Sequence, residues 1–455
     1  MLQPANRLPP EIIPRIAQHI LQGSKDIYPI IPLTHICRHW RQSIISAPEN
    51  WTLVSTTRMG LTALTLERSK TAALELRLDP HTTGFASFCD LILPYIQNIG
   101  TLQFRVFGTL EQLTQTIPNF PQSTPNLRVL ELTSVEGFDA SIDPFESFPN
   151  TLRSLSLIDI PLYPSFLKLR TLTKLSLEYF NMDCPALDTL LGFLEENRSL
   201  ESVDLTIRTD QEFPVRISHR QAVITNRLQH LSIASRDAMV ARTLVSSTPL
   251  RRGAHLEITL PCRGAGLGLN DILSNISMTH LSNLPSPTFM EYRSSIPMIR
   301  LIGPNGSFSY SRLESLEISP TEISVLPLTN IRELRLEHSD PPKTFHSSSF
   351  PALETLTIEC DTDISYLFHT LFPNPSLFPS LKTLGFMGCA ITEEFMEELA
   401  QFASGRKNTT SAWLHRVVIV HLGENIPSAT SIDELEEHVP IVDVRYGRKF
   451  PTDLT

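Results

Sequence analysis

The stretch NLRVLEL at residues 126–132 is followed by TLRSLSL at 151–157 and TLTKLSL at 171–177. All three have the form Leu-x-x-Leu-x-Leu. Further clear copies, some with Ile, Val or Phe in place of Leu, are SLESVDL 199–205, RLQHLSI 227–233, RLESLEI 312–318, NIRELRL 330–336, ALETLTI 352–358 and SLKTLGF 380–386. Looser copies surround Leu102, Leu256, Leu281 and Val417, which makes about thirteen in all, so the pattern indicates a repeat architecture.

From Leu102 to Leu231 the central residues of successive copies are 28, 25, 20, 28 and 28 residues apart, close to the period of leucine-rich repeats. Each copy is predicted to be a short strand whose alternate leucines enter a core that only a stack of strands can bury. The sequence thus predicts an α/β fold in which residues 81–446 form an irregular leucine-rich-repeat solenoid. We expect a curved parallel sheet with helices and loops on its convex side.

The segments between these strands contain helical patterns. Helices are predicted over 185–197, 392–402 and 432–438, with Thr392 as the N-cap of the second. Residues 53–80 are predicted to hold a connecting helix (60–70) and the first strand of the array (72–78). Residues 439–446 are predicted to form a closing strand, and 447–455 a tail. We interpret Cys389 as the structural cysteine that ends a repeat strand.

Two short stretches precede the array: LPPEIIPRIAQHI at residues 8–20 and LTHICRHWRQSIISAPENW at 33–51. Ile12, Ile13, Ile16 and Ile20 fall on one stripe of a helix. A second stripe, over three predicted turns, consists of Leu33, Ile36, Cys37, Trp40 and Ile44. Two helices this short cannot bury both stripes against each other, so some apolar surface should remain for a partner or for the array.

Residues 1–52 resemble the F-box family. The matching residues are Leu8, Pro9, Pro10, Glu11, Ile12, Ile13, Ile16, Ile20, Leu33, Ile36, Cys37, Arg38, Trp40, Arg41, Pro48 and Trp51. The resemblance implies a small helical module that docks onto the adaptor subunit of an SCF-type cullin–RING ubiquitin ligase. Two features depart from the family pattern. The connection from Leu21 to Pro32 is long, and Ala17 stands where Phe or Leu is common, which would remove an apolar anchor.

The array resembles those that follow F-boxes in many ligase receptors. This implies a non-catalytic receptor that contacts the adaptor, and through it a cullin, while the array binds a protein substrate. The alternative is a protein-binding scaffold whose N-terminal helices only cap the solenoid. The sequence contains no G-x-S-x-G, H-E-x-x-H or kinase motif, so we expect neither an enzyme nor a cofactor.

Composition narrows the function classes. The 455 residues carry a formal charge of −10, which argues against a nucleic-acid backbone as the main partner. The six cysteines form no CxxC pair, which favours reduced thiols and a cytoplasmic or nuclear protein. No run approaches the roughly 18 apolar residues of a membrane span.

Two local motifs could bind ligands. His35, Cys37 and His39 in THICRH could share a metal, although surface histidines beside a buried thiol are the preferred interpretation. Gly264, Gly266 and Gly268 follow a predicted strand, but their G-x-G-x-G spacing matches neither nucleotide-binding fingerprint. We therefore predict a turn within one repeat, and no metal site.

The residues that alternate with the inward leucines should lie on the open, concave face of the sheet. Acidic side chains outnumber basic ones there by six, counting Lys174 among the basic ones, which favours a basic protein surface as the partner. The alternative is a solvated face that binds nothing. The candidate substrate-binding residues are Glu131, Glu178, Asp204, Glu257, Glu317, Glu333, Arg335, Glu337 and Glu359.

Overall fold

The computed structural model divides the chain into two compact units, Met1–Gln211 (unit 1) and Glu212–Thr455 (unit 2). It describes residues 8–22, 24, 26–56, 59–107, 111–135, 148, 150–181, 184–208, 227–235, 238–248, 250, 253–260, 287, 289–293, 298–303, 306–312, 326, 328–337, 350–359, 378–389, 391–409, 413–421 and 427–446. Several predictions concern residues outside these ranges: the repeat strand centred on Leu316 with Glu317, the strand near Leu281, the glycine loop at 264–268 and the tail 447–455.

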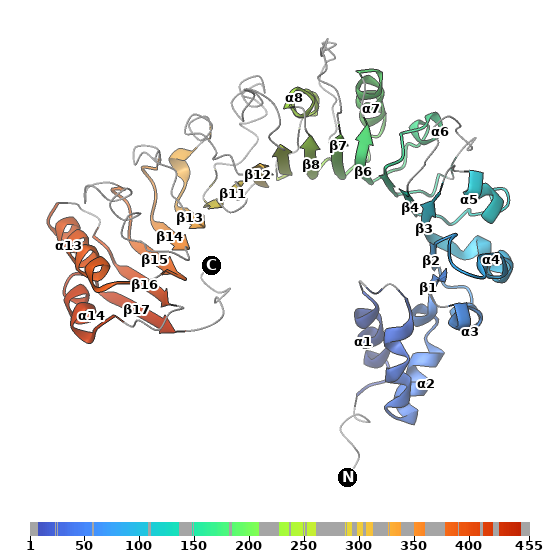
Figure 1. Ribbon diagram of the computed structural model, residues 1–455, viewed down its shortest axis with the longest axis horizontal. Helices are drawn as coiled ribbons and strands as arrows, with labels where there is room; N and C mark the ends of the chain where they lie inside the picture. The colour runs from blue at the N-terminus through green and yellow to red at the C-terminus, as the bar shows by residue number, and fades with distance from the viewer. Residues whose placement is uncertain are drawn as a thin grey trace. The chain divides into compact units, whose positions relative to one another are not determined.

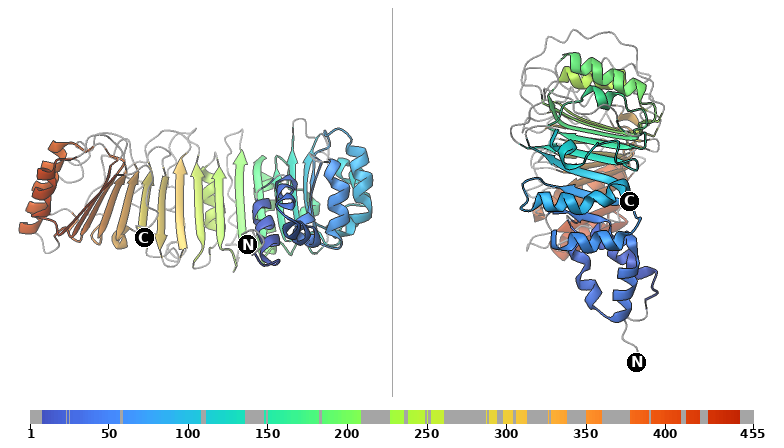
Figure 2. Two further views of the ribbon diagram at one scale, coloured as in Figure 1. Left: turned by 90° about the horizontal axis from the view of Figure 1, so that it is seen from below. Right: turned by 90° about the vertical axis from the view of Figure 1, so that its right-hand side faces the viewer.

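Unit 1 begins with a helical module, residues 8–51. Its elements are α1 (Ile12–Leu21), η2 (Tyr28–Ile30), η3 (Pro32–His35), α2 (Arg38–Ser46) and η4 (Pro48–Trp51), where η marks a 3₁₀ helix. Proline opens both η3 and η4, where its fixed φ suits the first helical position and its missing N–H costs no bond. In the right-hand view of Figure 2 the module, in dark blue, lies next to the first strands of the unit.

The strands of unit 1 form a parallel sheet in chain order. They are β1 (Leu53–Ser55), β2 (Leu74–Leu78), β3 (Ile99–Val106), β4 (Val129–Ser134), β5 (Ser154–Ile158), β6 (Lys174–Asn181) and β7 (Ser202–Arg208). The central residues predicted from the repeat pair directly: Leu102 with Leu130, Leu130 with Leu155 and Leu155 with Leu175. All four are fully buried. The predicted repeat strands are thus confirmed here, although β1 precedes the strand expected to be first.

The described helices that follow the module in unit 1 lie on the outer side of this sheet (Figure 1). They are α3 (Met59–Ser69), α4 (Phe85–Ile92), η6 (Leu93–Asn98), α5 (Glu111–Thr116), α6 (Pro164–Leu167) and α7 (Cys184–Glu196). Helices α3 and α7 match the predicted helices over 60–70 and 185–197. The leucines of α7 that made its pattern helical, among them Leu190 and Leu194, are buried.

Hydroxyl side chains form hydrogen bonds between successive repeats of unit 1. Thr151 donates a hydrogen bond to the carbonyl of Leu127 (2.9 Å), and Thr171 donates to that of Leu152 (2.8 Å). Ser199 donates to the carbonyl of Leu172 over 2.7 Å. These bonds explain why Thr or Ser precedes the first leucine of three successive copies, because each hydroxyl satisfies a backbone acceptor of the copy before it.

Unit 2 has a sheet in the spatial order β8, β9, β12, β11, β10, β13, β14, β15, β16, β17. The strands are β8 (His230–Ser235), β9 (His255–Leu260), β10 (Phe289–Arg293), β11 (Met298–Gly303), β12 (Gly306–Arg312), β13 (Glu333–Glu337), β14 (Thr355–Glu359), β15 (Thr383–Met387), β16 (Arg416–His421) and β17 (Ile441–Tyr446). The helices are α8 (Ala238–Ser247), η7 (Leu328–Asn330), α13 (Glu393–Thr409) and α14 (Ala429–Glu436).

Strand β11 is antiparallel to both its neighbours, β10 and β12. Every other pairing between the described strands of this sheet is parallel, so β10, β11 and β12 form a meander inserted between β9 and β13. The repeat pattern did not predict it because these strands lack Leu-x-x-Leu-x-Leu. The Asn305–Gly306 pair between two strand-like runs is a sequence signal of a hairpin that could have revealed it.

The end of unit 2 has the predicted order of elements, although α13 continues to Thr409, seven residues beyond the predicted end at Phe402. Thr392 accepts a hydrogen bond from the N–H of Phe395 (3.1 Å), as expected of the N-cap of α13. Helix α14 and strand β17 match the predicted closing helix and strand within a few residues. Cys389 is 2% exposed, and its Sγ lies 3.4 Å from the carbonyl of Met387, which agrees with a structural role.

Candidate partner-binding surfaces

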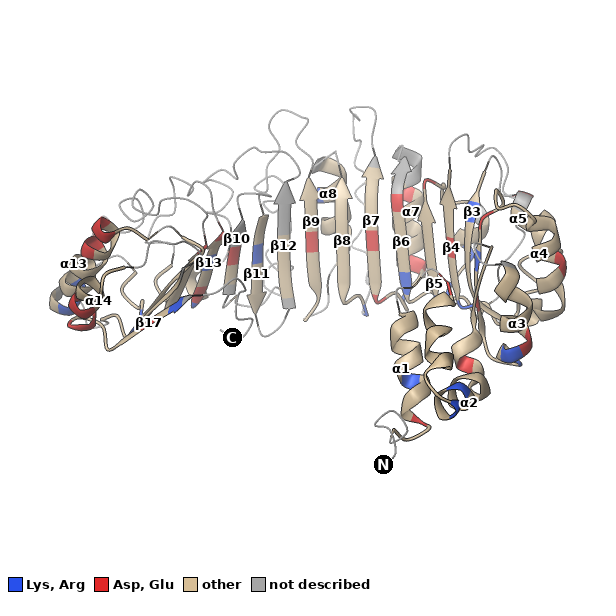
Figure 3. Ribbon diagram, turned by 60° about the horizontal axis from the view of Figure 1, so that its bottom comes forward, with Lys and Arg blue, Asp and Glu red and all other residues tan. Residues whose placement is uncertain are grey.

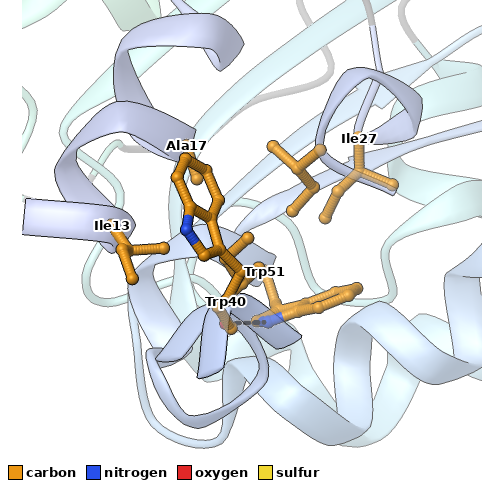
Figure 4. Packing of buried hydrophobic residues seen from close by; sticks show 7 residues of the cluster. Ile13, Ala17, Ile27, Trp40 and Trp51 are labelled. Carbon is orange, nitrogen blue, oxygen red and sulfur yellow. Dashed lines mark hydrogen bonds between the residues drawn. The ribbon is translucent and has the colours of Figure 1, made fainter. Parts of the chain in front are cut away.

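The helical module has its own hydrophobic core. The indole Nε1 of Trp51 donates to the carbonyl of Ile44 over 3.0 Å (Figure 4). Leu61 and Leu64 of α3 pack against the same core, so the module is attached to the array. The buried core residues are Ile13, Ala17, Ile27, Ile30, Trp40, Ile44 and Trp51.

Three isoleucines of the module remain in solvent. Ile12 is 38% exposed, Ile20 37% and Ile36 46%. Ile12 and Ile20 are eight residues apart, so they lie on similar faces of α1, whereas Ile13 and Ala17 point into the core. The stripe predicted for α1 is therefore divided between a buried and an exposed face. We call Ile12, Ile20 and Ile36 the exposed isoleucines.

The sixteen residues that carry the family resemblance divide in the same way. Ile13, Trp40 and Trp51 are buried. Leu8, Ile16, Leu33, Cys37 and Pro48 are half-buried. Pro9, Pro10, Glu11, Ile12, Ile20, Ile36, Arg38 and Arg41 are exposed. Only the last two groups offer surface to a partner.

The helix predicted to run continuously from Leu33 through Ile44 is wrong in its first turn. Cys37 has an extended backbone (φ −162°, ψ 172°), and α2 begins only at Arg38. The carbonyl of Cys37 accepts the N–H of Arg41 (3.0 Å), which makes Cys37 the N-cap. The break separates Ile36 from the buried face of α2 and leaves it in solvent.

The connection between α1 and α2 contributes two isoleucines to the module core. The sequence patterns did not predict this. Ile27 and Ile30 are 2% and 0% exposed. The guanidinium of Arg77 on β2 donates to the carbonyl of Ser24 over 2.6 Å. The described residues of the connection, 24 and 26–32, therefore belong to the module, and Arg77 joins them to the array.

The side chain of Ala17 points into the module core. From the sequence, Ala17 was expected to remove an apolar contact that a Phe or Leu would make with a partner. Its side chain is fully buried, and Figure 4 shows the indole of Trp40 beside it. The small methyl group leaves room for that indole in the core.

The THICRH motif has a structural use at His39. Its Nε2 lies 2.9 Å from the carbonyl of Leu8, which joins α2 to the start of the module. Within the ranges that the structure describes, no group of three or more His, Cys, Asp or Glu side chains could hold a metal ion.

The second candidate surface is the open face of each sheet, opposite the buried leucines. In unit 1 its middle row runs through Arg77, Gln103, Glu131, Ser156, Ser176 and Asp204 in direct strand register. These side chains are half-buried and alternate along each strand with buried leucine, valine or phenylalanine, as predicted. Glu178 lies one row away on β6.

Acidic and basic residues both lie on the strands (Figure 3), and some carboxylates of the open faces pair with arginines. Arg335 pairs with Glu359 (2.6 Å), and Arg77 pairs with Glu75 (2.5 Å). Arg77 lies on β2, outside the repeat copies from which the acidic excess was counted, so the predicted charge did not include it. Of the other candidates in unit 2, Glu257, Glu333 and Glu337 are also half-buried on the open face.

A polar cluster on the open face of unit 2 was not foreseen. The rings of His230 and His255 stack at 5.0 Å, and Nδ1 of His255 lies 2.5 Å from Oγ of Ser307. Burial, with His230 nearby, lowers the pKa of His255. The parallel pairing of β8 with β9 places His230 beside His255, and the pairing of β12 with β9, which the meander creates, adds Ser307.

Glu131 is a carboxylate of the unit 1 open face whose charged form is disfavoured by its surroundings. Burial raises its pKa, and the negative charges of Glu178 and Glu75 raise it further. Arg77 and a hydrogen bond from Gln103 (3.1 Å) act in the opposite direction. A cationic group from a partner would therefore be favoured near Glu131.

We expect Glu131→Gln to raise the melting temperature of unit 1 at pH 7. Because the folded-state pKa of Glu131 is raised, folding disfavours its charged form, and stability falls as pH rises from its unfolded pKa through its folded pKa. The gain should shrink when thermal unfolding is repeated below the ordinary pKa of glutamate. Glu201→Gln, at an exposed site, should change little at either pH. A gain at pH 7 that persists unchanged in acid would contradict the electrostatic explanation.

Within the described residues, no helix is long and apolar enough to cross a membrane. No protein-family model matches this chain, and no curated protein sequence matches it significantly.

Proposed function

We propose that this protein is a non-catalytic substrate receptor of an SCF-type cullin–RING ubiquitin ligase. The helical module would bind the adaptor subunit, and the open face of the array would hold a protein substrate. The observation that carries the proposal is the set of exposed isoleucines on a module whose sequence resembles an F-box. Burying the area that these side chains still expose is worth on the order of 1 kcal/mol each.

Replacing Ile12 and Ile36 together by glutamate should abolish co-purification with a recombinant adaptor subunit. Both side chains are exposed, so the substitutions should leave the fold intact, while two carboxylates placed in an apolar interface cost several kcal/mol. The measurement is capture of the purified adaptor by the full chain at fixed concentrations.

Leu91→Glu provides a matched control, because Leu91 is an apolar residue of α4 with 41% exposure. It should capture the adaptor as wild type does. Equal loss in the control, or unchanged capture by the double variant, would refute docking through these isoleucines.

A second candidate is a protein-binding scaffold whose helical module only caps the solenoid. It is favoured by the packing of Leu61 and Leu64 against the module core and by the bond from Arg77 to Ser24. Deleting residues 1–52 would expose those leucines under either proposal, so truncation cannot separate them. A folded wild-type chain that fails to capture the adaptor would favour the scaffold.

For the substrate, we propose a basic protein surface that binds the open face of unit 1 near Glu131. The support is the raised pKa of Glu131, caused first by burial and further by the nearby carboxylates of Glu178 and Glu75. Unmodified basic peptides should bind better than their phosphorylated forms. Tighter binding of the phosphopeptides would reject this substrate class.

A further inference from the structure

The sheet of unit 2 ends at β17, which pairs with β16 on one side. The N–H of Ile441 donates to the carbonyl of His415 over 3.2 Å, so the backbone groups of residues 441, 443 and 445 face β16. Those of residues 442, 444 and 446 face the opposite edge. Among the described strands of unit 2, none pairs with that edge, so it can accept another strand.

The apolar side chains of β17 are also only partly covered by the rest of the chain. Val442 and Val444 are only half-buried, whereas their register partners on β16, Val417 and Ile419, are fully buried. On the open face, Ile441 is 53% exposed. A repeat array needs its terminal hydrophobic surface covered, and β17 covers its own incompletely.

We propose that β17 pairs with β17 of a second copy of this chain, antiparallel, about a two-fold axis at Val444. The outward-facing backbone groups of residues 442, 444 and 446 would then exchange hydrogen bonds with those of residues 446, 444 and 442 of the second copy. In the same register Asp443 lies opposite Arg445 of the second copy, and the two form non-hydrogen-bonded pairs, where side chains are closest.

Charge favours this register over the two that differ from it by moving the axis one residue along the strand. Moving the axis to residue 443 places Asp443 opposite Asp443, and moving it to residue 445 places Arg445 opposite Arg445; both like-charge pairs are unfavourable. Asp443 already contacts Arg445 and Arg416 of its own chain (2.6 and 3.2 Å). The guanidinium of Arg445 is 44% exposed and has further N–H donors for the second copy.

The test is sedimentation of the full chain over a concentration series. The wild type should reach twice its 51.2 kDa mass. Asp443→Arg alone and Arg445→Asp alone should each weaken the dimer by about tenfold or more, because each places like charges opposite one another twice. The double swap Asp443→Arg with Arg445→Asp should restore the dimer.

Val444→Pro tests the backbone pairing, because it deletes an outward-facing N–H without removing a bond to β16. It should abolish the dimer while circular dichroism reports a folded chain. A monomer at all concentrations, or a dimer that survives both single swaps, would overturn the proposal. So would a single swap that is not rescued by the double swap. This inference does not depend on the ligase proposal, because no adaptor or substrate is present in the test.

Discussion

Replacing Arg406 by alanine should destabilise unit 2 by about 3 kcal/mol or more, since two carbonyls would lose a charged donor inside the core. Arg406, in α13, is fully buried. Its Nη2 donates to the carbonyl of Leu381 over 3.0 Å and to that of Phe378 over 3.2 Å. Burial lowers its pKa to about 10, yet it stays charged at neutral pH. The substitution would also open a cavity between α13 and the start of the β15 repeat.

Urea unfolding followed by circular dichroism measures this loss. Lys407→Ala, an exposed neighbour on the same helix, should change stability by less than about 0.5 kcal/mol. Arg406→Lys should fall between the two, because a lysine keeps the charge, but its ammonium group sits on a shorter side chain and cannot replace Nη2 at both carbonyls without a shift. If Arg406→Ala were as stable as Lys407→Ala, the two carbonyl contacts would carry no net stability.

The contrast between Arg406 and the repeat leucines shows what the sequence could predict. The strands and their register follow from leucines such as Leu130 and Leu155, because side-chain alternation and stacking are local rules repeated many times. Arg406 in the last turn of α13 instead resembles an ordinary basic residue at a helix end. Its burial depends on a strand repeat some 25 residues away, which no local pattern reports.

The features of the candidate surfaces also divide into those that local sequence patterns predict and those that depend on tertiary packing. The module and its apolar stripes were predictable from spacing, whereas the break at Cys37 and the burial of Ile27 and Ile30 were not. These features depend on how α1, α2 and the connection pack together. On the open faces, the acidic residues were predictable from alternation, but the neighbouring arginines required the cross-strand register, including that of the inserted meander.

Trp51→Ala should be the most damaging single substitution in unit 1, with an expected loss of about 3–5 kcal/mol. Trp51 is fully buried, and the guanidinium of Arg68 on α3 lies 4.3 Å from its ring centroid. The indole therefore contacts both the module core and the first helix of the array. Truncating it would weaken their attachment, so amide hydrogen exchange should increase in α2 and α3 together.

Two matched variants distinguish the effect of burying the indole from the effect of its hydrogen bond. Trp413→Ala removes an indole that is 40% exposed and should cost less than about 1 kcal/mol. Trp51→Phe keeps an aromatic ring but removes the donor to the Ile44 carbonyl, which retains only a longer contact from Nδ2 of Asn50 (3.4 Å). Its cost should be about 1–3 kcal/mol. Exchange that rises in α2 but not in α3 would mean that Trp51 stabilises the module alone, and that Leu61 and Leu64 suffice to attach it.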